Sequence, residues 1–387
     1  MDQDFSNISV YATSGNCLSP AGSNVSENLV AIDKGNLAIE KHSNSDLSES
    51  PFYGAIISET VIEKEFSKLN YEGPFSKLEK MILIVLNGIV TKYSHVFSKR
   101  CGIIFSTTKG NIDALDNAEI ENYYLHNTAS KISKAMDIKT QPIVLSNACV
   151  SGIMAVSVAK RLIQTDKYDH IVVVGADLFS KFVFSGFQSF QAVSPKPCKP
   201  YSKNRDGITL GEAAAAMFVT KDKSLLTSNS YKITGESSIN DANHISGPSR
   251  TGEGLFQSVQ KAIKEAGVKP KDIDMISSHG TATNYNDEME AQAFSRADLA
   301  QTPLFSLKGF FGHTLGAAGL LETVISLASA DENKIPPSFG FDEMGVTLPL
   351  NISAQTQSKS IHTVLKTASG FGGSNTAVIF QKFNTNE

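Results

Sequence analysis

One of the four cysteines, Cys149, has sequence surroundings that suit a nucleophile. Cys149 lies in the segment 146–152, SNACVSG, between an expected strand at 142–146 and an expected helix at 152–164. A thiol at a helix N-terminus meets the positive end of the helix dipole, which lowers its pKa and favours the reactive thiolate. A buried structural cysteine at a tight turn is the alternative interpretation.

Two histidines in the second half of the chain could supply acid–base or hydrogen-bonding chemistry. His279 follows an expected strand at 274–278, and the carboxyl end of a strand faces the crevice of an open α/β sheet. His313 stands five positions after Lys308, at the entrance of a helix of small residues expected over 314–330. A capping histidine at 279 and tight helix packing over 314–330 are the alternatives, although packing does not explain the polar pair.

A glycine loop, GFGGSN, occupies 370–375. It could cradle a phosphate, but it lacks the lysine of a P-loop and the spacing of a dinucleotide fingerprint. A turn that presents backbone N–H groups to an oxyanion fits the same residues.

Strands and helices alternate along the chain, which predicts an α/β fold with buried, mainly parallel sheets. We expect residues 14–50, rich in Ser, Asn and Gly, to form a loop-dominated segment. Both halves contain an apolar strand that ends in a reactive residue near a helix entrance, which indicates duplication. Strands are expected at 101–106, 142–146, 170–177, 211–219, 231–236, 274–278, 362–368 and 376–381, and helices at 57–69, 75–94, 120–136, 152–164, 252–266, 287–295 and 314–330.

Composition excludes several classes of protein. With 387 residues, 41% hydrophobic and 19% charged, the chain is globular. Its 35 Lys and Arg against 39 Asp and Glu give a net charge of −4, the wrong sign for a generic nucleic-acid binder. We expect a cytoplasmic protein, because no apolar run is long enough to span a membrane and the acidic start does not resemble a secretory signal. The four cysteines form no C-x-x-C pair, so neither a disulfide framework nor a zinc site is predicted.

The segments 146–152, 279–283, 308–319 and 370–375, in this order, resemble the β-ketoacyl-acyl-carrier-protein synthases, condensing enzymes of the thiolase superfamily. The resemblance runs from about residue 143 to 379, and the stretches 201–211 and 241–254 also fit it. One cysteine with two histidines is similar to the elongating synthases. The resemblance implies a thiolase-type αβαβα layered fold built from two similar halves, with the cysteine in 1–230 and the two histidines in 231–387.

The resemblance also implies catalytic roles. Cys149 would take an acyl chain from an acyl carrier protein as a thioester. His279 and His313 would polarise the malonyl thioester carbonyl, aid its decarboxylation and stabilise the enolate, while Lys308 would orient a histidine and tune the charge of the site. Because carbon dioxide leaves, no metal or redox cofactor is needed, and the substrates would arrive on the phosphopantetheine arm of the carrier protein.

Further residues would support these groups. The backbone N–H groups of Cys149 and Phe371 would form the acyl oxyanion hole, and the Phe371 ring would gate the acyl pocket. Thr281 and Thr283 would hydrogen-bond the phosphopantetheine arm. Glu322 would lie behind the catalytic residues.

Some segments depart from the pattern of the family. The N-terminal strand and its glycine-rich turn are poorly reproduced in 9–26, and Asn147 and Val150 stand where many members have threonine and serine. The run STTKGNI at 106–112 is similar to a divergent bacterial branch associated with aryl-polyene or flexirubin-type pigment clusters. These departures leave the catalytic set intact.

The expected partners are an acyl carrier protein and a second chain, in a homodimer or a related heterodimer. A net-acidic chain needs a local basic patch to dock an acidic carrier protein, and Lys203 and Arg205 are the predicted residues. A structural turn at 205–207 is the competing explanation for Arg205. The phenylalanine-rich stretch 179–190 favours core or dimer interface over acyl-pocket lining.

Two other functions remain as alternatives. A chain-length-factor subunit pairs with an active ketosynthase, but such subunits typically lack the nucleophile that Cys149 would provide. A thiolase acting on coenzyme A esters is disfavoured, because thiolases use a second cysteine near the end and the 370–375 loop contains none.

Overall fold

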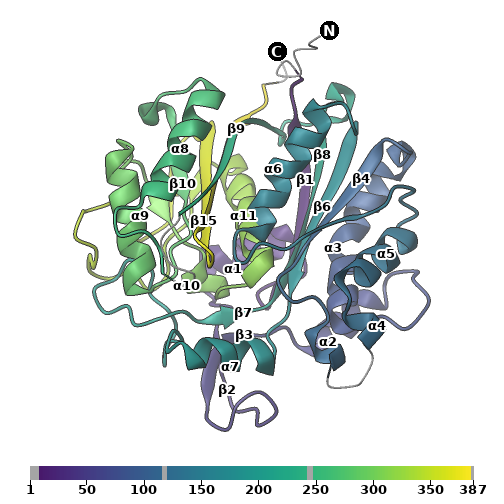
Figure 1. Ribbon diagram of the computed structural model, residues 1–387, viewed down its shortest axis with the longest axis horizontal. Coiled ribbons are helices and arrows are strands. Elements are labelled where there is room, and N and C mark those ends of the chain that lie inside the picture. Colours follow the sequence, from purple (N-terminus) through teal and green to yellow (C-terminus); the bar gives the residue numbers. More distant parts are fainter. Residues whose placement is uncertain (1–7, 116–119, 242–246, 385–387) are drawn as a thin grey trace.

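Two sets of five strands form the centre of the structure, a computed structural model that describes residues 8–115, 120–241 and 247–384 (Figure 1). In both sets the strands lie side by side in the order third, second, fourth, fifth, first. The first set is β1 (Tyr11–Leu18), β4 (Cys101–Ser106), β5 (Ile143–Leu145), β6 (His170–Asp177) and β8 (Ala213–Thr220), and the second is β9 (Tyr231–Asn240), β10 (Met275–Ser277), β11 (Leu304–Phe305), β14 (Thr363–Gly370) and β15 (Ser374–Lys382).

Strand directions repeat as well. In each set the second, third and fourth strands run parallel, and the fifth and first are antiparallel to their neighbours. The expectation of mainly parallel sheets therefore holds for the middle of each set and is wrong for the inner edge. There the two sets meet through a short antiparallel pairing of β1 with β9, at Tyr11 with Lys232 and Ala12 with Tyr231. The repeated topology shows two similar halves. The boundary between 230 and 231 stays a prediction.

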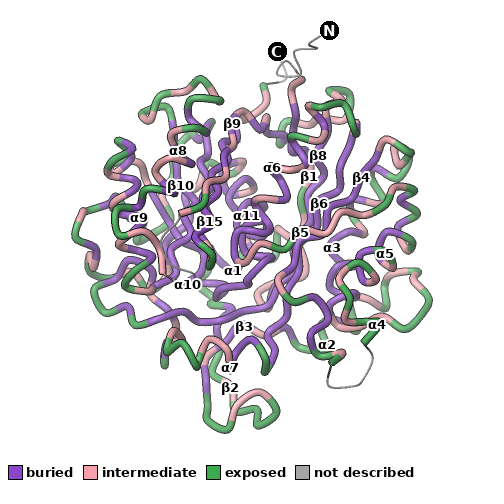
Figure 2. Tube along the Cα trace, viewed as in Figure 1, coloured by how far each residue is buried: buried purple, intermediate pink, exposed green. Residues whose placement is uncertain are grey.

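Two helices form a middle layer between the sheets. Helices α6 (Ser151–Gln164) and α11 (Ala318–Asp331) pack on each other, and each contacts strands of both sets. They approach closely because glycines lie at the crossing: a Cβ at Gly152 would lie 2.6 Å from the Leu320 nitrogen, and one at Gly319 would lie 2.7 Å from the Ile153 nitrogen. The small residues at this crossing therefore serve packing, and Figure 2 shows this layer buried.

Other helices cover the outer faces and complete five layers, α-β-α-β-α. The first sheet is covered by α3 (Lys77–Tyr93) and α5 (Leu125–Ala135), and the second by α8 (Glu253–Ala266), which packs beside α9 (Asn284–Arg296). The other elements are α1 (Val25–Lys34), β2 (Glu40–His42), β3 (Phe52–Ala55), α2 (Glu59–Phe66), α4 (Ile120–Tyr123), α7 (Lys181–Ser189), β7 (Leu210–Gly211), α10 (Lys308–Phe311), β12 (Lys334–Ile335) and β13 (Gln357–Ser358).

The prediction that residues 14–50 are mainly loop is wrong at its start. Strand β1 lies between β8 and β9 in the centre of the combined sheet, and α1 follows it. Pairing on both edges and burial stabilise β1 despite its small and polar residues, so tertiary context overrides propensity. Helix α1 has a sequence signal at each end: Asn24 accepts the Glu27 N–H, and Gly35 ends the helix at φ 68°.

The phenylalanine-rich stretch divides between core and surface. Phe179 and Phe184 are buried and pack with Phe52, whereas Phe182 and Phe190 are 57% and 62% exposed. Phe190 also lines the cavity described below, so one stretch serves both of the roles that we weighed. Among the described residues, no helix combines the length and the apolar character needed to cross a bilayer.

Candidate active site

Cys149 sits in the turn that joins β5 to α6, two residues before the helix begins at Ser151. Ala148 adopts φ 43°, in the left-handed region that residues with a Cβ rarely enter and that is common in functional turns. The Ser151 hydroxyl donates to the Ala148 carbonyl at 2.6 Å and accepts the Asn147 N–H at 2.8 Å. These bonds hold the turn so that Cys149, 8% exposed, stands at the helix entrance.

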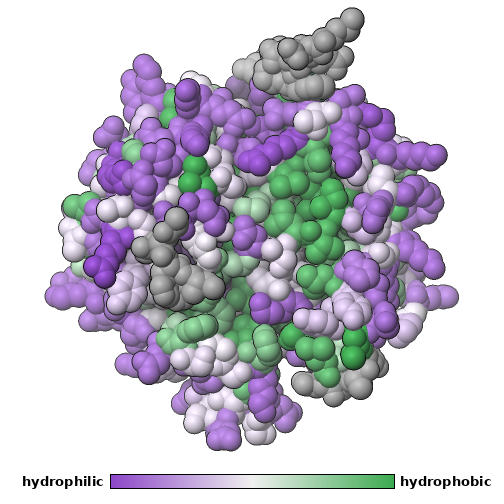
Figure 3. Space-filling view, in the orientation of Figure 1, coloured by the Kyte–Doolittle hydropathy of each residue, from purple (hydrophilic) through white to green (hydrophobic). Residues whose placement is uncertain are grey.

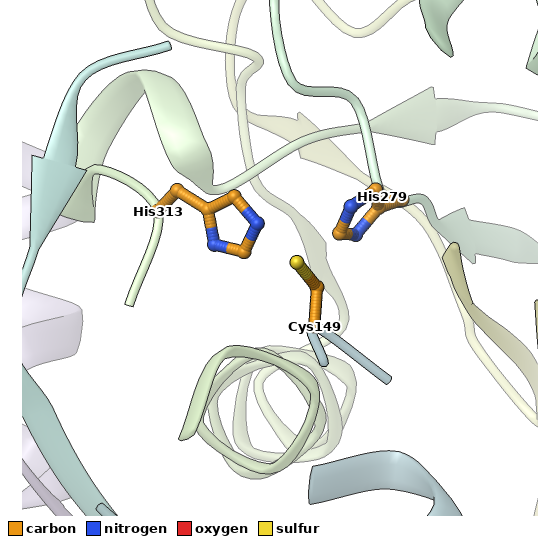
Figure 4. A group of neighbouring side chains, drawn as sticks. All are labelled: Cys149, His279 and His313. Atoms are coloured by element: carbon orange, nitrogen blue, oxygen red, sulfur yellow. The ribbon is translucent and has the colours of Figure 1, made fainter. Parts of the chain in front are cut away.

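The second half of the chain brings both histidines to this cysteine. His279 follows the end of β10, and His313 follows α10. One nitrogen of each ring and the Cys149 sulfur all lie within 4.8 Å of one another. The ring centroids are 5.3 Å apart at an interplanar angle of 84°, and Figure 4 shows both imidazoles facing the sulfur. The structure thus assembles the three residues from segments that lie far apart in the sequence.

Hydrogen bonds define which nitrogen of each imidazole carries the proton. His313 Nδ1 accepts the Leu315 backbone N–H at 3.1 Å. His279 Nδ1 lies 3.2 Å from Lys308 Nζ, and an ammonium offers donors alone. Both neutral rings therefore hold their proton on Nε2. The pair presents two N–H donors, which suits an oxygen atom that gains negative charge.

The charge state of the histidines follows from their surroundings. Burial, and then the charge of Lys308, hold the pKa of His279 and of His313 well below the ordinary value of an imidazole. Lys366 acts in the same direction on both pKa values. Both rings are therefore neutral at pH 7.

The pKa of the nucleophile differs from the sequence-based expectation. Burial raises the pKa of Cys149 to about 11, whereas the helix position predicted a lowered value. The Lys308 charge and the backbone N–H groups of Phe371 and Cys149 act in the lowering direction, but the loss of solvent outweighs them. The resting group is therefore a thiol.

Lys308 and Glu322 lie behind the histidines, where the resemblance places them. Their side chains are 1% and 3% exposed, and Lys308 Nζ is 2.6 Å from Glu322 Oε1. Lys308 also donates to the His279 carbonyl oxygen at 2.6 Å. A buried ammonium with these partners is fully hydrogen-bonded, as a buried charge must be. It fixes the orientation of His279 through the ring and the backbone together.

Phe371 borders the sulfur from the glycine loop that follows β14. Its backbone N–H acts on the Cys149 sulfur together with the N–H of Cys149 itself, which is the arrangement expected of an acyl oxyanion hole. Its ring is 39% exposed and packs on Phe187 and Phe190, with centroids 5.8 and 5.9 Å away. The ring thus stands at the border between the sulfur and solvent, where a gate would act.

A cavity of about 410 Å³ opens above these groups. Cys149, His279 and His313 line it, together with Thr281 and Thr283. The two threonine hydroxyls are 2.9 Å apart, and Thr283 also accepts the Asn286 N–H as the N-cap of α9. The two threonines therefore belong to the wall of the same cavity as the sulfur.

The predicted docking residues do not share one environment. Arg205 is 9% exposed, and its guanidinium donates to the carbonyl oxygens of Ser202 and Gly345. A buried arginine that holds two loops cannot meet a partner, so the docking prediction for Arg205 is wrong and the structural turn explains it. Lys203 is 61% exposed but pairs with Glu343 at 2.8 Å, so its charge is locally balanced.

Two buried ionisable residues near the histidines escaped sequence reasoning. Lys366 lies inside β14, and its Nζ is 2.6 Å from Glu322 Oε2. Glu290 accepts the backbone N–H groups of His279 and Gly280 at 2.8 and 2.7 Å, and burial raises its pKa to about 7. The sequence does contain a signal for Lys366, because a lysine in the middle of an apolar strand is unusual. Segment 242–246, part of a stretch that fits the resemblance, lies outside the described residues.

The structure thus combines a five-layered fold with a thiol and two neutral imidazoles at the junction of its two halves. The chain matches the model "Beta-ketoacyl synthase, N-terminal domain" over residues 101–224 and the model "Beta-ketoacyl synthase, C-terminal domain" over residues 231–342. Together the two segments cover more than half of the chain. The chain belongs to the β-ketoacyl synthase family, which confirms the resemblance inferred from its motifs.

Curated relatives are similar over part of their length. The 3-oxoacyl-[acyl-carrier-protein] synthase 2 of Coxiella burnetii is 30% identical over 265 residues, which are 65% of this chain and 64% of that protein. The protein of the same name from Rhizobium meliloti is 31% identical over 251 residues, 61% of this chain and 59% of that protein. The matched segments therefore leave more than a third of each relative uncovered.

Solved structures match over nearly the whole chain. A chain of the complex between the ketosynthase ApeO and its chain length factor ApeC from Xenorhabdus doucetiae is 24% identical, with a TM-score of 0.85, covering 99% of this chain and 100% of that one. A β-ketoacyl synthase from Burkholderia phymatum is 22% identical, with a TM-score of 0.84 and coverages of 97% and 100%. These likenesses confirm the predicted thiolase-type fold.

Proposed function

We propose that this chain catalyses the decarboxylative condensation of an acyl group held on Cys149 with malonyl-acyl carrier protein, giving a β-ketoacyl-acyl carrier protein. The observation that carries the proposal is the cluster of one thiol and two neutral imidazoles within 4.8 Å. The names of the curated relatives, 3-oxoacyl-[acyl-carrier-protein] synthase 2, support the same reaction.

In the first half-reaction the Cys149 thiol loses its proton and its sulfur attacks the carbonyl carbon of an acyl thioester. The carbonyl oxygen becomes an oxyanion, which the N–H groups of Cys149 and Phe371 stabilise. The carrier thiolate leaves with the electron pair of the broken C–S bond and takes up the proton. The acyl group is then a thioester of Cys149.

In the second half-reaction the Nε2–H groups of His279 and His313 donate to the thioester carbonyl of the malonyl group. Carbon dioxide leaves, and the electron pair of the broken C–C bond forms an enolate whose oxygen the two donors stabilise. The enolate carbon attacks the acyl carbonyl on Cys149, and the cysteine thiolate leaves and is reprotonated. No electrons are exchanged with a redox partner.

We propose that the reaction uses neither a metal nor a redox cofactor. The cysteine and the two histidines could surround a metal ion by distance alone. Both Nδ1 atoms receive hydrogen bonds, however, so each Nε2 keeps its proton and has no lone pair for a metal. The phosphopantetheine arm of the carrier protein would occupy the cavity beside Thr281 and Thr283.

A second ketosynthase-like chain is the proposed structural partner, identical or related. Strand β5 ends the order of the first sheet and pairs with β4 on one side. Its residues and the outward residues of α6 are apolar and half-buried, and Figure 3 shows an apolar area over this part of the molecule. An edge strand of this kind presents unpaired backbone N–H and C=O groups with which another chain can pair. The similarity to a chain of the ApeO–ApeC complex supports a heterodimer with a related chain.

We place this reaction in fatty acid or polyketide-type synthesis in the cytoplasm, including the pigment branch that segment 106–112 resembles. A chain-length-factor type of subunit is the second candidate, favoured by the complex that contains such a factor among the similar structures. The reactive set around Cys149 opposes it, because that role needs no acyl-enzyme.

One assay separates these functions. The purified chain is incubated with malonyl-carrier protein, with and without an acyl-carrier protein and a co-encoded ketosynthase-like subunit. Release of carbon dioxide together with an acyl-enzyme at Cys149, detected by mass spectrometry, supports the proposal. A chain that never acquires the acyl group, while its partner does, acts as the chain-length-factor type of subunit.

A further inference from the structure

Lys366 carries a charge in the middle of a buried strand. In β14 it pairs in register with Ser277 of β10, and Val364 and Ala368 on the same face belong to the central apolar core. Its side chain is 0% exposed. A buried ammonium is strongly destabilising unless all its protons are bonded, so its partners must compensate for the lost water.

The structure supplies three acceptors for the three protons of this ammonium. Glu322 Oε2 lies 2.6 Å away, and the carbonyl oxygens of Ser277 and Ser278 both lie 3.3 Å away. The set is complete for a lysine side chain. Lys366 is therefore a built element of the interior.

Both kinds of acceptor, the backbone carbonyl oxygens and the carboxylate, connect Lys366 to His279. Ser277 and Ser278 directly precede His279, so Lys366 fixes the end of the strand that carries the histidine. Glu322 shares its other oxygen with Lys308, whose ammonium contacts His279 at the carbonyl oxygen and at Nδ1. A single carboxylate thus bridges two ammonium groups.

We propose that Lys366 is a positioning residue for the decarboxylation step. Its ammonium holds the Glu322 carboxylate and the end of β10 in place, so that Lys308 keeps donating to Nδ1 and His279 keeps its proton on Nε2. Lys366 touches neither the cavity nor the sulfur, and it acts through Lys308 and Glu322. This inference rests on the proposed function.

Two substitutions test the role. Lys366→Met keeps the volume of the side chain and removes the charge, and Lys366→Ala opens a space lined by one carboxylate and two carbonyl oxygens. We expect carbon dioxide release from malonyl-carrier protein to fall about 10- to 100-fold in kcat, as for other residues that support a catalytic group, with KM little changed. Acyl transfer to Cys149 should stay near the wild-type rate, which also verifies folding.

Lys160→Met is the matched control. Lys160 is 2% exposed and bonded to Glu265, but it lies on α6 away from the histidines. Its substitution removes a buried, paired lysine without reaching His279. We expect this variant to lose stability and to keep the ratio of decarboxylation to acyl transfer.

Chemical rescue separates positioning from general support of the fold. Ammonium or methylammonium ions should restore decarboxylation at least several-fold in Lys366→Ala, whereas tetramethylammonium at equal ionic strength, or Lys366→Met with any amine, should show no rescue. Unchanged decarboxylation in Lys366→Met, or equal and unrescued loss of both half-reactions in both variants, overturns the inference. Failure of the wild-type chain to release carbon dioxide would instead overturn the proposed function.

Discussion

The two halves of the molecule use the same connection for different chemistry. In the first half the third strand, β5, leads through a short turn into α6, and the turn carries Cys149. In the second half the third strand, β11, leads through α10 into α11, and this longer connection carries Lys308 and His313. Equivalent places in a duplicated fold thus hold the proposed nucleophile, Cys149, and two of the groups proposed to serve its partner substrate, Lys308 and His313.

The surroundings of these connections differ more than their topology does. Around Cys149 the neighbouring groups are backbone N–H groups, one of Cys149 itself and one of Phe371 from the second half, and burial raises the thiol pKa. Around the histidines the second half gathers buried charges, with Glu322 between Lys308 and Lys366. This contrast indicates a division of labour. In the proposed reaction Cys149 of the first half forms the covalent bond, and the second half stabilises the charge that develops during decarboxylation.

Removing the nucleophile gives the sharpest test of this division. Cys149→Ala should abolish acyl transfer and condensation, because no sulfur remains to form the thioester. Decarboxylation of malonyl-carrier protein should persist, because the imidazole donors are intact. Mass spectrometry of the acylated protein and capture of carbon dioxide measure the two results, and Cys101→Ala, at a buried cysteine of β4, is the control. An acyl-enzyme in the Cys149 variant would assign the nucleophile elsewhere.

The raised thiol pKa predicts how the first half responds to pH. With a pKa near 11, the thiolate fraction of Cys149 rises about tenfold per pH unit between pH 7 and pH 10. The rate of iodoacetamide labelling, followed by mass spectrometry of the tryptic peptide, should therefore rise roughly a thousandfold over this range. A rate that levels off below pH 8 would show that the turn lowers the pKa, as the helix position had suggested.

Substitution of the histidines should give the reverse of the Cys149→Ala result, with decarboxylation reduced and acyl transfer retained. His279→Ala and His313→Ala should each lower decarboxylation and condensation about 100- to 1000-fold, the usual effect of losing one oxyanion donor. Acyl transfer to Cys149 should continue, since backbone groups serve that step. His362→Ala, at an exposed histidine, is the control. Condensation at full rate in either variant would remove that histidine from the mechanism.

Local sequence identified the candidate reacting residues because their chemistry resides in short segments. A strand end, a turn and a helix start follow from residue patterns, so Cys149, His279 and His313 could be placed at such ends. The convergence of these three residues in space depends on how the two halves pack. Only the resemblance to a known family predicted that convergence. The fold class followed from the same motifs.

Other features depend on contacts between distant segments. Strand β1 is stabilised by β8 and β9 on its two sides, which its own polar residues do not reveal. Arg205 lies two positions after Lys203 in sequence, yet the Arg205 guanidinium binds two loops while the Lys203 ammonium reaches solvent. The proposed role of Lys366 depends on its contact with Glu322, which lies 44 positions away in sequence.

The smallest expected effect concerns carrier-protein docking at Lys203, on the surface that both halves share. The exposed pair of Lys203 with Glu343 has little net field, so each charge should matter modestly. Lys203→Glu should raise the KM for acyl carrier protein about two- to fivefold, and Glu343→Gln should lower it by a similar factor, because the lysine is then unpaired. Added salt should narrow both differences. Activity on a small pantetheine thioester should stay constant in both variants, since that substrate has no acidic surface. If Glu343→Gln leaves the KM for the carrier protein unchanged, or if both substrates respond equally, Lys203 does not contribute to docking and the carrier protein binds elsewhere.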